Sequence, residues 1–303
     1  MTSEELNLLI KLDAEGFFPA PGEDVSTFFK RAEQTAAAHK NFEKQLSENG
    51  EVVIFDVVTV KKEDRISGEL VDNSTEITEK LYRFSARNIP GFYLTKAVGL
   101  LWGGCMLSDP EEHFSVFLLR NIFRRRRKFL NYERSELLAH ELCHTARQSL
   151  SEWSLEEYFA YQTSGSKFRR YMGNCFIRDL DALLFLLPIM MLPLIQILHY
   201  TLLPSLPLLP FWLLALCYPV FLLWRNARSH SVVNRARKIL LANGITEPEP
   251  ILFRCTLDEL HTIGKFSSKS ADFFKWADDM SGKELRWAVI KRRFLENPEE
   301  KTL

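Results

Sequence analysis

The hydrophobic and polar positions divide the chain into a mixed first half, a long apolar block and a charged tail. Residues 182–224 are 43 positions without Asp, Glu, Lys or Arg, and charged residues are frequent on both sides of them. The sequence Pro-Ser-Leu-Pro at 204–207 divides this block into 182–203 and 208–224. A membrane span needs ~20 apolar residues, with a range of ~17–25, so each half is long enough for one. We predict a membrane hairpin at residues 181–224.

Prolines and flanking charges bear on how this hairpin lies in the bilayer. Four prolines would kink its helices, so it either spans the membrane or re-enters from one leaflet; they are Pro188, Pro193, Pro210 and Pro219. Basic residues flank both ends, and none lies at the tip: Arg169, Arg170, Arg178, Arg225, Arg228, Arg235, Arg237 and Lys238. Because positive flanks remain on the cytoplasmic side, we expect both ends of the hairpin, and the protein body, in the cytoplasm.

The first fifty residues predict helix. Asp24 is placed to cap a helix that continues to about Ser47 and ends before Gly50, a residue suited to the position after a helix. We therefore expect residues 1–50 to form an N-terminal helical segment.

Residues 51–180 predict a compact core in which a small sheet precedes two helices. Residues 51–60 are mostly β-branched or aromatic, which is typical of a strand, whereas 61–90 fits no single pattern. Residues 91–123 are mostly apolar and are interrupted by a turn at Ser108-Asp109-Pro110, so we expect two or three further strands there. The predicted fold class is α+β.

Residues 225–303 predict a helical C-terminal domain. A helical pattern over 231–243 ends at Gly244. The segments Thr256–Glu259 and Ser281–Glu284 have the spacing of a capping box, in which two side chains satisfy the backbone at a helix start.

Charge and cysteine content narrow the classes of function. Lys+Arg and Asp+Glu number 39 each, so the net charge gives no argument for a nucleic-acid partner. The five cysteines are scattered without CxxC spacing, which is typical of reduced thiols and not of a disulfide framework or a cysteine zinc site. The first residues, MTSEELNLLIKLDAEG, lack the basic start and apolar run of a secretory signal.

Residues 135–150 predict an amphipathic helix that carries the pattern HExxH. His140 and His144 lie on one helix face, about 6 Å apart along the axis, so both imidazoles can reach one zinc ion at about 2.0–2.1 Å. Glu141 is the candidate general base, which takes a proton from the attacking water and later gives it to the leaving amine. Burial of these groups without a partner would be costly, which favours a metal site over a chance pattern.

A catalytic zinc site needs a third protein ligand, and a second short helix beginning near Ser154 offers carboxylates. We prefer Glu157, because Ala160 lies three residues on along the same face and lets this helix pack closely against the first. The alternative is that Glu157 only caps the helix together with Ser154, in which case Glu156 or Glu152 becomes the candidate ligand.

The segments HELCH at 140–144 and EEYFAY at 156–161 resemble the gluzincins, the thermolysin-like class of zinc peptidases. In that class a glutamate on a second helix completes the metal site, so the resemblance implies Zn2+ as cofactor and a polypeptide as substrate. An acidic residue commonly lies four positions after that glutamate and hydrogen-bonds a ligand histidine; this chain has Tyr161 there. In many zinc peptidases the strand before the active helix also binds substrate, a role that His113–Leu130 would take.

We therefore predict a membrane-anchored zinc peptidase that acts at the cytosolic membrane face. Its expected partners are a polypeptide substrate and the lipid bilayer, and no nucleic acid. The alternative is a non-catalytic membrane scaffold with a structural or vestigial zinc site. Glu141 favours the enzyme, since a purely structural site has no use for it. The candidates for orienting the ligands or stabilising the transition state are Tyr158, Tyr161, Tyr171, Arg147 and Glu156.

Overall fold

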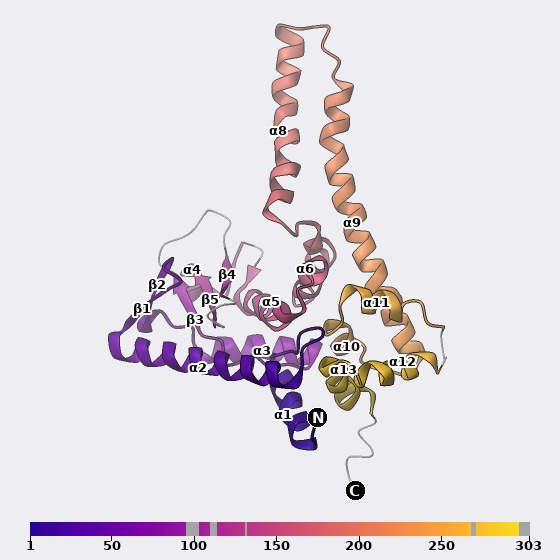
Figure 1. Ribbon diagram of the computed structural model, residues 1–303. Helices are drawn as coiled ribbons and strands as arrows, with labels where there is room; N and C mark the ends of the chain where they lie inside the picture. The colour runs from indigo at the N-terminus through magenta and orange to yellow at the C-terminus, as the bar shows by residue number, and fades with distance from the viewer. Residues whose placement is uncertain (95–102, 110–113, 131, 268–270, 297–303) are drawn as a thin grey trace.

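The computed structural model describes residues 1–94, 103–109, 114–130, 132–267 and 271–296. Helices and small sheets pack into a body, and two long helices project from it side by side (Figure 1). The mixture of helix and sheet is consistent with the predicted α+β class.

The N-terminal segment contains α1 (Ser3–Ala14) and α2 (Val25–Asn49). Asp24 caps α2 as predicted, since its carboxylate accepts hydrogen bonds from the backbone N–H groups of Ser26 and Thr27 at 2.9 and 3.0 Å. Gly50 follows with a φ of 75°, a left-handed conformation that glycine adopts without strain.

The predicted strand at 51–60 is a hairpin of β1 (Glu51–Ile54) and β2 (Val58–Lys61). Phe55 and Asp56 turn the chain through positive φ angles of 49° and 55°, which a continuous apolar pattern does not reveal. The segment without a clear pattern contains α3 (Gly68–Tyr82).

The buried face of α3 carries hydroxyl side chains in place of the usual apolar ones. The Ser74 hydroxyl donates to the Leu70 carbonyl at 2.7 Å, and the Thr78 hydroxyl donates to the Thr75 carbonyl at 3.0 Å. Because these side chains satisfy their hydrogen bonds within the helix, they can be buried, and the hydrophobic periodicity is lost.

The main sheet has the strand order β3-β5-β4, formed by β3 (Gly91–Leu94), β5 (Phe114–Arg120) and β4 (Gly104–Asp109). The prediction of two or three strands is confirmed for the described residues. β5 lies in the centre, parallel to β3 and antiparallel to β4. β4 is therefore an edge strand, and it packs against the helix that carries HExxH.

Short elements connect this sheet to the two helices of the predicted core. They are α4 (Ile122–Arg125), β6 (Lys128–Phe129), β7 (Tyr132–Glu133), α5 (Arg134–Arg147), the 3₁₀ turn η2 (Gln148–Leu150) and α6 (Trp153–Tyr161). α5 packs against α3, α6 and β4 through a face that includes Leu138, Leu142 and Ala146, all of them buried.

The projecting helices are α8 (Asp179–Thr201) and α9 (Leu209–Ala242), which follow α7 (Lys167–Met172) and the 3₁₀ turn η3 (Gly173–Cys175). Two stretches of the described chain, Leu180–Thr201 and Leu209–Ala242, are long and apolar enough to cross a membrane. In the most apolar 18-residue stretch of each helix, only 6% and 17% of the stretch is buried, whereas the core helix of a soluble protein is mostly buried.

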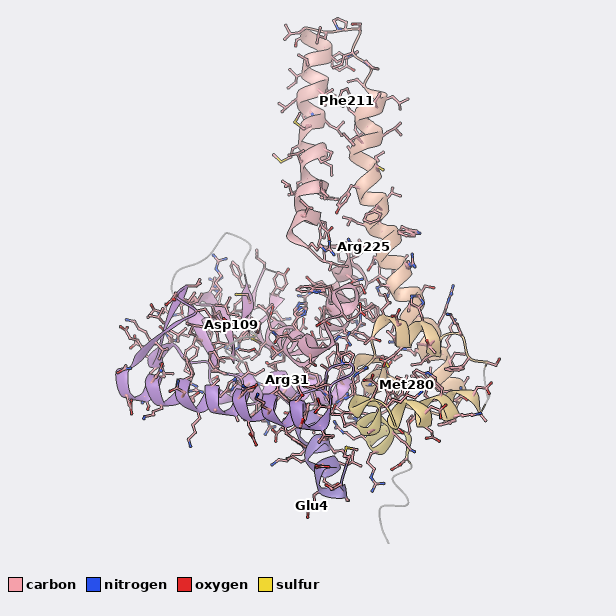
Figure 2. The ribbon with its side chains drawn as sticks, in the orientation of Figure 1. Glu4, Arg31, Asp109, Phe211, Arg225 and Met280 are labelled. Carbon is pink, nitrogen blue, oxygen red and sulfur yellow. The ribbon has the colours of Figure 1, made fainter. Side chains whose placement is uncertain are left out.

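α9 continues without a break from the projecting pair into the body. Figure 2 labels Phe211 on the projecting part and Arg225 where the helix meets the body. The helix predicted at 231–243 is thus the end of α9, and Gly244 follows it with a φ of 87°. At the foot of the pair, Asp181 of α8 accepts hydrogen bonds from Arg225 and Tyr218 of α9, at 2.6 Å each.

The C-terminal helices are α10 (Glu249–Phe253), α11 (Leu257–Ile263), α12 (Asp272–Ser281) and α13 (Leu285–Ile290), the last continuing as a π-helical turn to Leu295. The capping box of Thr256 and Glu259 is confirmed at the start of α11. The second predicted capping box is wrong, because Glu284 accepts a hydrogen bond from the backbone N–H of Gly22 at 2.8 Å instead.

Candidate metal centre

α5 and α6 bring three ligand-type side chains of the described chain together: His140, His144 and Glu157. The Nε2 atoms of the two histidines are 3.1 Å apart; that of His140 lies 3.5 Å from Oε2 of Glu157, and that of His144 lies 3.5 Å from Oε1 of the same carboxylate. Ligand atoms at zinc distances of ~2.0–2.1 Å with tetrahedral angles are about 3.3 Å apart. The spacing of these three groups therefore fits a single zinc ion.

The local fold explains this convergence. The apolar face of α5 is buried in the core, so the histidines lie on the neighbouring face, where His140 is 14% and His144 25% exposed at the side chain. Ala160 of α6 is completely buried, as expected of a small residue at a close contact between helices.

The remaining nitrogen of each imidazole has a partner of its own. His140 is hydrogen-bonded to the backbone of Ala160, and the Nδ1 of His144 lies 3.7 Å from a carboxylate oxygen of Glu156. Glu156 in turn accepts a hydrogen bond of 3.0 Å from Nε of Arg147. Such partners fix the ring orientation and leave Nε2 of both histidines directed at the same point.

Glu141 lies beside this group and is held by the edge strand. Its Oε2 accepts a hydrogen bond from the backbone N–H of Met106 in β4 at 3.1 Å. Burial, together with the negative charge of Glu157, raises the pKa of Glu141 to about 7, although His144 and the Met106 hydrogen bond oppose the rise. A carboxylate with a pKa near neutrality is suited to accept and return a proton.

The charges around the histidines favour a cation. Burial lowers the pKa of His140 well below its usual value. Burial also acts to lower the pKa of His144, but the carboxylates of Glu156, Glu157 and Glu141 outweigh it and raise that pKa to about 9. Burial raises the pKa of Glu157 itself. Three carboxylates, those of Glu141, Glu156 and Glu157, thus surround His144, and a cation bound there would be attracted to them.

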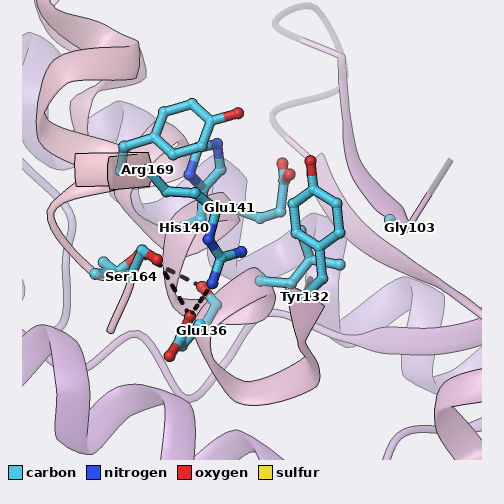
Figure 3. Close-up of a pocket in the computed structure, with 11 residues that line it drawn as sticks. Gly103, Tyr132, Glu136, His140, Glu141, Ser164 and Arg169 are labelled. Atoms are coloured by element: carbon cyan, nitrogen blue, oxygen red, sulfur yellow. Dashed lines mark hydrogen bonds and ion pairs between the residues drawn. The ribbon is translucent and has the colours of Figure 1, made fainter. Parts of the chain in front are cut away.

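A cavity of about 250 Å³ opens next to this group, between α5 and the start of β4 (Figure 3). Glu141 and His140 line one wall, and Tyr132 contributes a ring whose hydroxyl points to the same side of the cavity as the Glu141 carboxylate. Arg169 and Glu136 form an ion pair at 2.6 Å in its interior. The cavity joins the candidate metal centre to polar side chains from α5, β7 and α7.

Tyr161 also lines the cavity, and its ring meets that of His140 edge-on at 4.6 Å. Where the gluzincins commonly have an acidic residue that hydrogen-bonds a ligand histidine, Tyr161 contributes this ring contact. Gly173 leaves room for the ring, since a Cβ at that position would lie 2.1 Å from a ring atom. Burial raises the pKa of Tyr161, so its hydroxyl stays protonated at neutral pH and can donate a hydrogen bond.

Of the three carboxylates considered as the third ligand, only Glu157 lies with the two histidines. α6 begins at Trp153 without a side-chain cap, so Glu157 does not act as a capping residue. Glu152 accepts hydrogen bonds from the backbone N–H of Leu257 and the hydroxyl of Ser154, and it is not part of the ligand group. Glu156 lies behind His144, on the side away from Glu157.

Three residues considered for the transition state lie elsewhere. Tyr158 and Tyr171 pack on the two sides of His230, at ring distances of 4.8 and 4.6 Å. Arg147 is fully buried beneath Glu156. None of the three lines the cavity beside His140.

The expectation that His113–Leu130 binds substrate as an added strand is wrong for the end of β5. Phe117–Arg120 lie between β3 and β4 in the sheet, so this part of the strand has no open side for a peptide. β4 is the outer strand of the described sheet and lies beside α5, and the hydrogen bond from Met106 to Glu141 places it at the site. His113 itself is outside the described residues.

Sequence reasoning missed the cavity residues Tyr132, Glu136, Ser164 and Arg169. Glu136 and Tyr132 lie just before the HExxH residues, and a search of the adjoining helical turn and strand would have found them. Arg169 was counted only among the charges flanking the membrane block. Its approach to Glu136 depends on the turn after α6 and has no local sequence signal.

Comparisons with known proteins add no relative: no family model, no curated protein and no solved structure matches this chain.

Proposed function

We propose that this chain is a membrane-anchored zinc peptidase. The observation that carries the proposal is the convergence of Nε2 of His140, Nε2 of His144 and the Glu157 carboxylate within 4.8 Å of one another, with Glu141 beside them. A zinc ion at this point would supply a Lewis acid for the substrate carbonyl and a more acidic water.

The side chains around the centre suit the remaining steps of peptide hydrolysis. Glu141 accepts the proton of the attacking water and returns it to the leaving amine. The hydroxyls of Tyr161 and Tyr132 line the cavity and are candidates for hydrogen-bonding the oxyanion. β4 (Gly104–Asp109) is the outer strand of the described sheet on the side of α5, so an extended peptide would approach the centre along it.

The two long apolar helices supply the membrane anchor in this proposal. They leave the body directly after η3, which packs against α6, so the centre lies near the foot of the hairpin. The basic residues on both flanks of the apolar block favour a cytoplasmic location for the body.

The ligand count favours the enzyme over a membrane scaffold with a structural zinc site. Structural zinc sites are closed by four protein ligands, whereas catalytic sites keep one position open. The one group of possible ligands that the described part of the chain offers contains three residues. Glu141 is adjacent and hydrogen-bonded to β4, where it can act on a bound water.

The decisive experiment measures zinc by mass spectrometry on full-length protein purified in detergent, together with hydrolysis of a fluorogenic peptide library. We expect about one zinc per chain in the wild type. His144→Ala and Glu157→Ala should lose both zinc and activity, whereas Glu141→Gln should keep zinc and lose at least ~100-fold in rate.

Glu152→Ala is the matched control, because Glu152 is a carboxylate on the same segment that stays outside the ligand group. It should keep both zinc and activity. Failure of the reconstituted wild type to bind zinc would refute the proposal. Zinc retained by Glu157→Ala would assign the third ligand to another residue, and full activity of Glu141→Gln would refute the role of the base.

A further inference from the structure

Arg169 occupies the cavity beside the candidate metal centre without using all of its hydrogen-bond donors. Its Nη2 donates to Glu136 at 2.6 Å, and its guanidinium lies 5.2 Å from the ring centre of Tyr132. Its Nε is buried and has no hydrogen-bond partner. Figure 3 shows the guanidinium inside the cavity, between Glu136 and Tyr132 and in front of His140.

Arginine presents five N–H donors in one plane, and one acceptor does not satisfy them. Arg169 lines the cavity while Glu136 accepts from its Nη2 alone, so the guanidinium donors that face the cavity are a binding position for an acceptor that enters it. The pair of donors on one edge of a guanidinium matches the two oxygens of a carboxylate.

The surrounding chain holds Arg169 in place before any ligand arrives. The hydroxyl of Ser166 caps α7 by accepting a hydrogen bond from the backbone N–H of Arg169 at 3.4 Å. Glu136 is held from a second side by the hydroxyl of Ser164 at 3.3 Å. Gly165 permits this approach, since a Cβ there would lie 2.8 Å from a carboxylate oxygen of Glu136.

We propose that Arg169 binds a carboxylate of the substrate, next to the bond that is cleaved. The inference rests on the proposed peptidase function and assigns its substrate class: peptides with an acidic side chain beside the scissile bond, or peptides cleaved close to a free C-terminus. Both sources present the same group to the cavity, where His140 and Glu141 form the adjoining wall.

The test compares matched peptides that differ only in one carboxylate. One pair has a free or an amidated C-terminus, and two pairs have Glu or Gln on either side of the scissile bond. In one of the three pairs, the wild type should cleave the peptide with the carboxylate at a kcat/KM at least ~10-fold higher than the peptide without it. This is the size of effect expected from a hydrogen bond to a charged group. The pair that responds identifies the source of the carboxylate.

Arg169→Met should bring that ratio to about one. Because this change leaves Glu136 buried without its cation, the double variant Arg169→Met with Glu136→Gln is measured beside it and should give the same ratio. Arg170→Met is the matched control, because Arg170 is on the same helix and lines a different cavity; it should keep the wild-type ratio.

A binding measurement separates this inference from the proposed function. Fluorescence anisotropy with labelled peptides and the Glu141→Gln protein detects the carboxylate without hydrolysis, and the carboxylate member should bind at least ~10-fold more tightly. Cleavage of all peptides with equal rates within every pair would overturn the role of Arg169 and leave the peptidase standing. Absence of cleavage with a carboxylate preference that Arg169→Met removes would support the binding site and count against the peptidase. Equal binding of both members would refute the inference.

Discussion

Two groups of buried carboxylates in this protein differ in what neutralises them. Under the C-terminal helices, Asp13 and Arg254 are both fully buried and joined by hydrogen bonds of 2.8 and 2.9 Å. Nearby, Glu259 accepts hydrogen bonds of 2.6 and 2.9 Å from Arg286. In the candidate metal centre, Glu141 and Glu157 are partly buried, and no arginine or lysine of the described residues forms an ion pair with either.

The pKa directions express this difference. Burial by itself would raise the pKa of Glu259, but the hydrogen bonds from Arg286 lower it below its usual value. Burial raises the pKa of Glu141 to about 7 and also raises that of Glu157. Arginines of the chain neutralise the carboxylates of the first group, whereas a bound cation would stabilise the ionised carboxylates of the second.

The largest expected effect concerns the complete group. Arg254→Met combined with Arg293→Met should lower the free energy of unfolding by about 3–5 kcal/mol, because Asp13 then stays charged and buried without either of its two arginine partners. Denaturation in detergent would measure this, and adding Asp13→Asn should restore part of the loss. Arg83→Met is the control, since Arg83 pairs with Glu247 at the surface and its loss should cost less than ~1 kcal/mol. An equal loss from Glu157→Ala in metal-free protein would remove the contrast between the two groups.

A smaller effect is expected when the support of the metal centre is weakened. Glu156→Gln removes the charge that faces Nδ1 of His144, and should weaken zinc binding by about 10–100-fold. Competition with a chromophoric chelator measures this affinity. Glu152→Gln should leave it unchanged, and an unchanged affinity in Glu156→Gln would show that Glu156 does not orient the ligand.

The smallest effect is a pH dependence of zinc binding. With a pKa of about 9, His144 is protonated at pH 8, whereas Glu141, with a pKa of about 7, is mostly ionised. Zinc must displace the proton of His144, so about one proton should leave per zinc at pH 8, and affinity should fall as the pH decreases from 9. Calorimetry in buffers of different ionisation enthalpy counts the protons. Release of none would contradict the raised pKa of His144.

The parts of the fold that could be predicted are those with local signals. Asp24, Gly50 and the Thr256 capping box mark helix ends through hydrogen bonds within a few residues, and the HExxH helix has a clear apolar face. α3 was missed because its buried hydroxyls conceal the periodicity, and the division of residues 51–60 depends on two residues with positive φ.

The candidate site divides in the same way. His140, Glu141 and His144 follow from spacing on one helix, and Glu157 was selected by its place on the next helix. Arg169 could not be found, because only the turn after α6 brings it to Glu136, 33 residues earlier in the chain. Long-range pairings of this kind carry no periodicity in the sequence.

The unbroken course of α9 has a consequence for the proposed membrane-anchored peptidase. A bilayer core ~30 Å thick would take up about 20 helical residues, so the 34 residues of α9 would extend about 20 Å further into the body. The Asp181–Arg225 pair joins α8 and α9 at the foot of the hairpin. In that proposal α9 would hold the body at a set height above the lipid surface, and peptide bonds at that height would be the ones within reach.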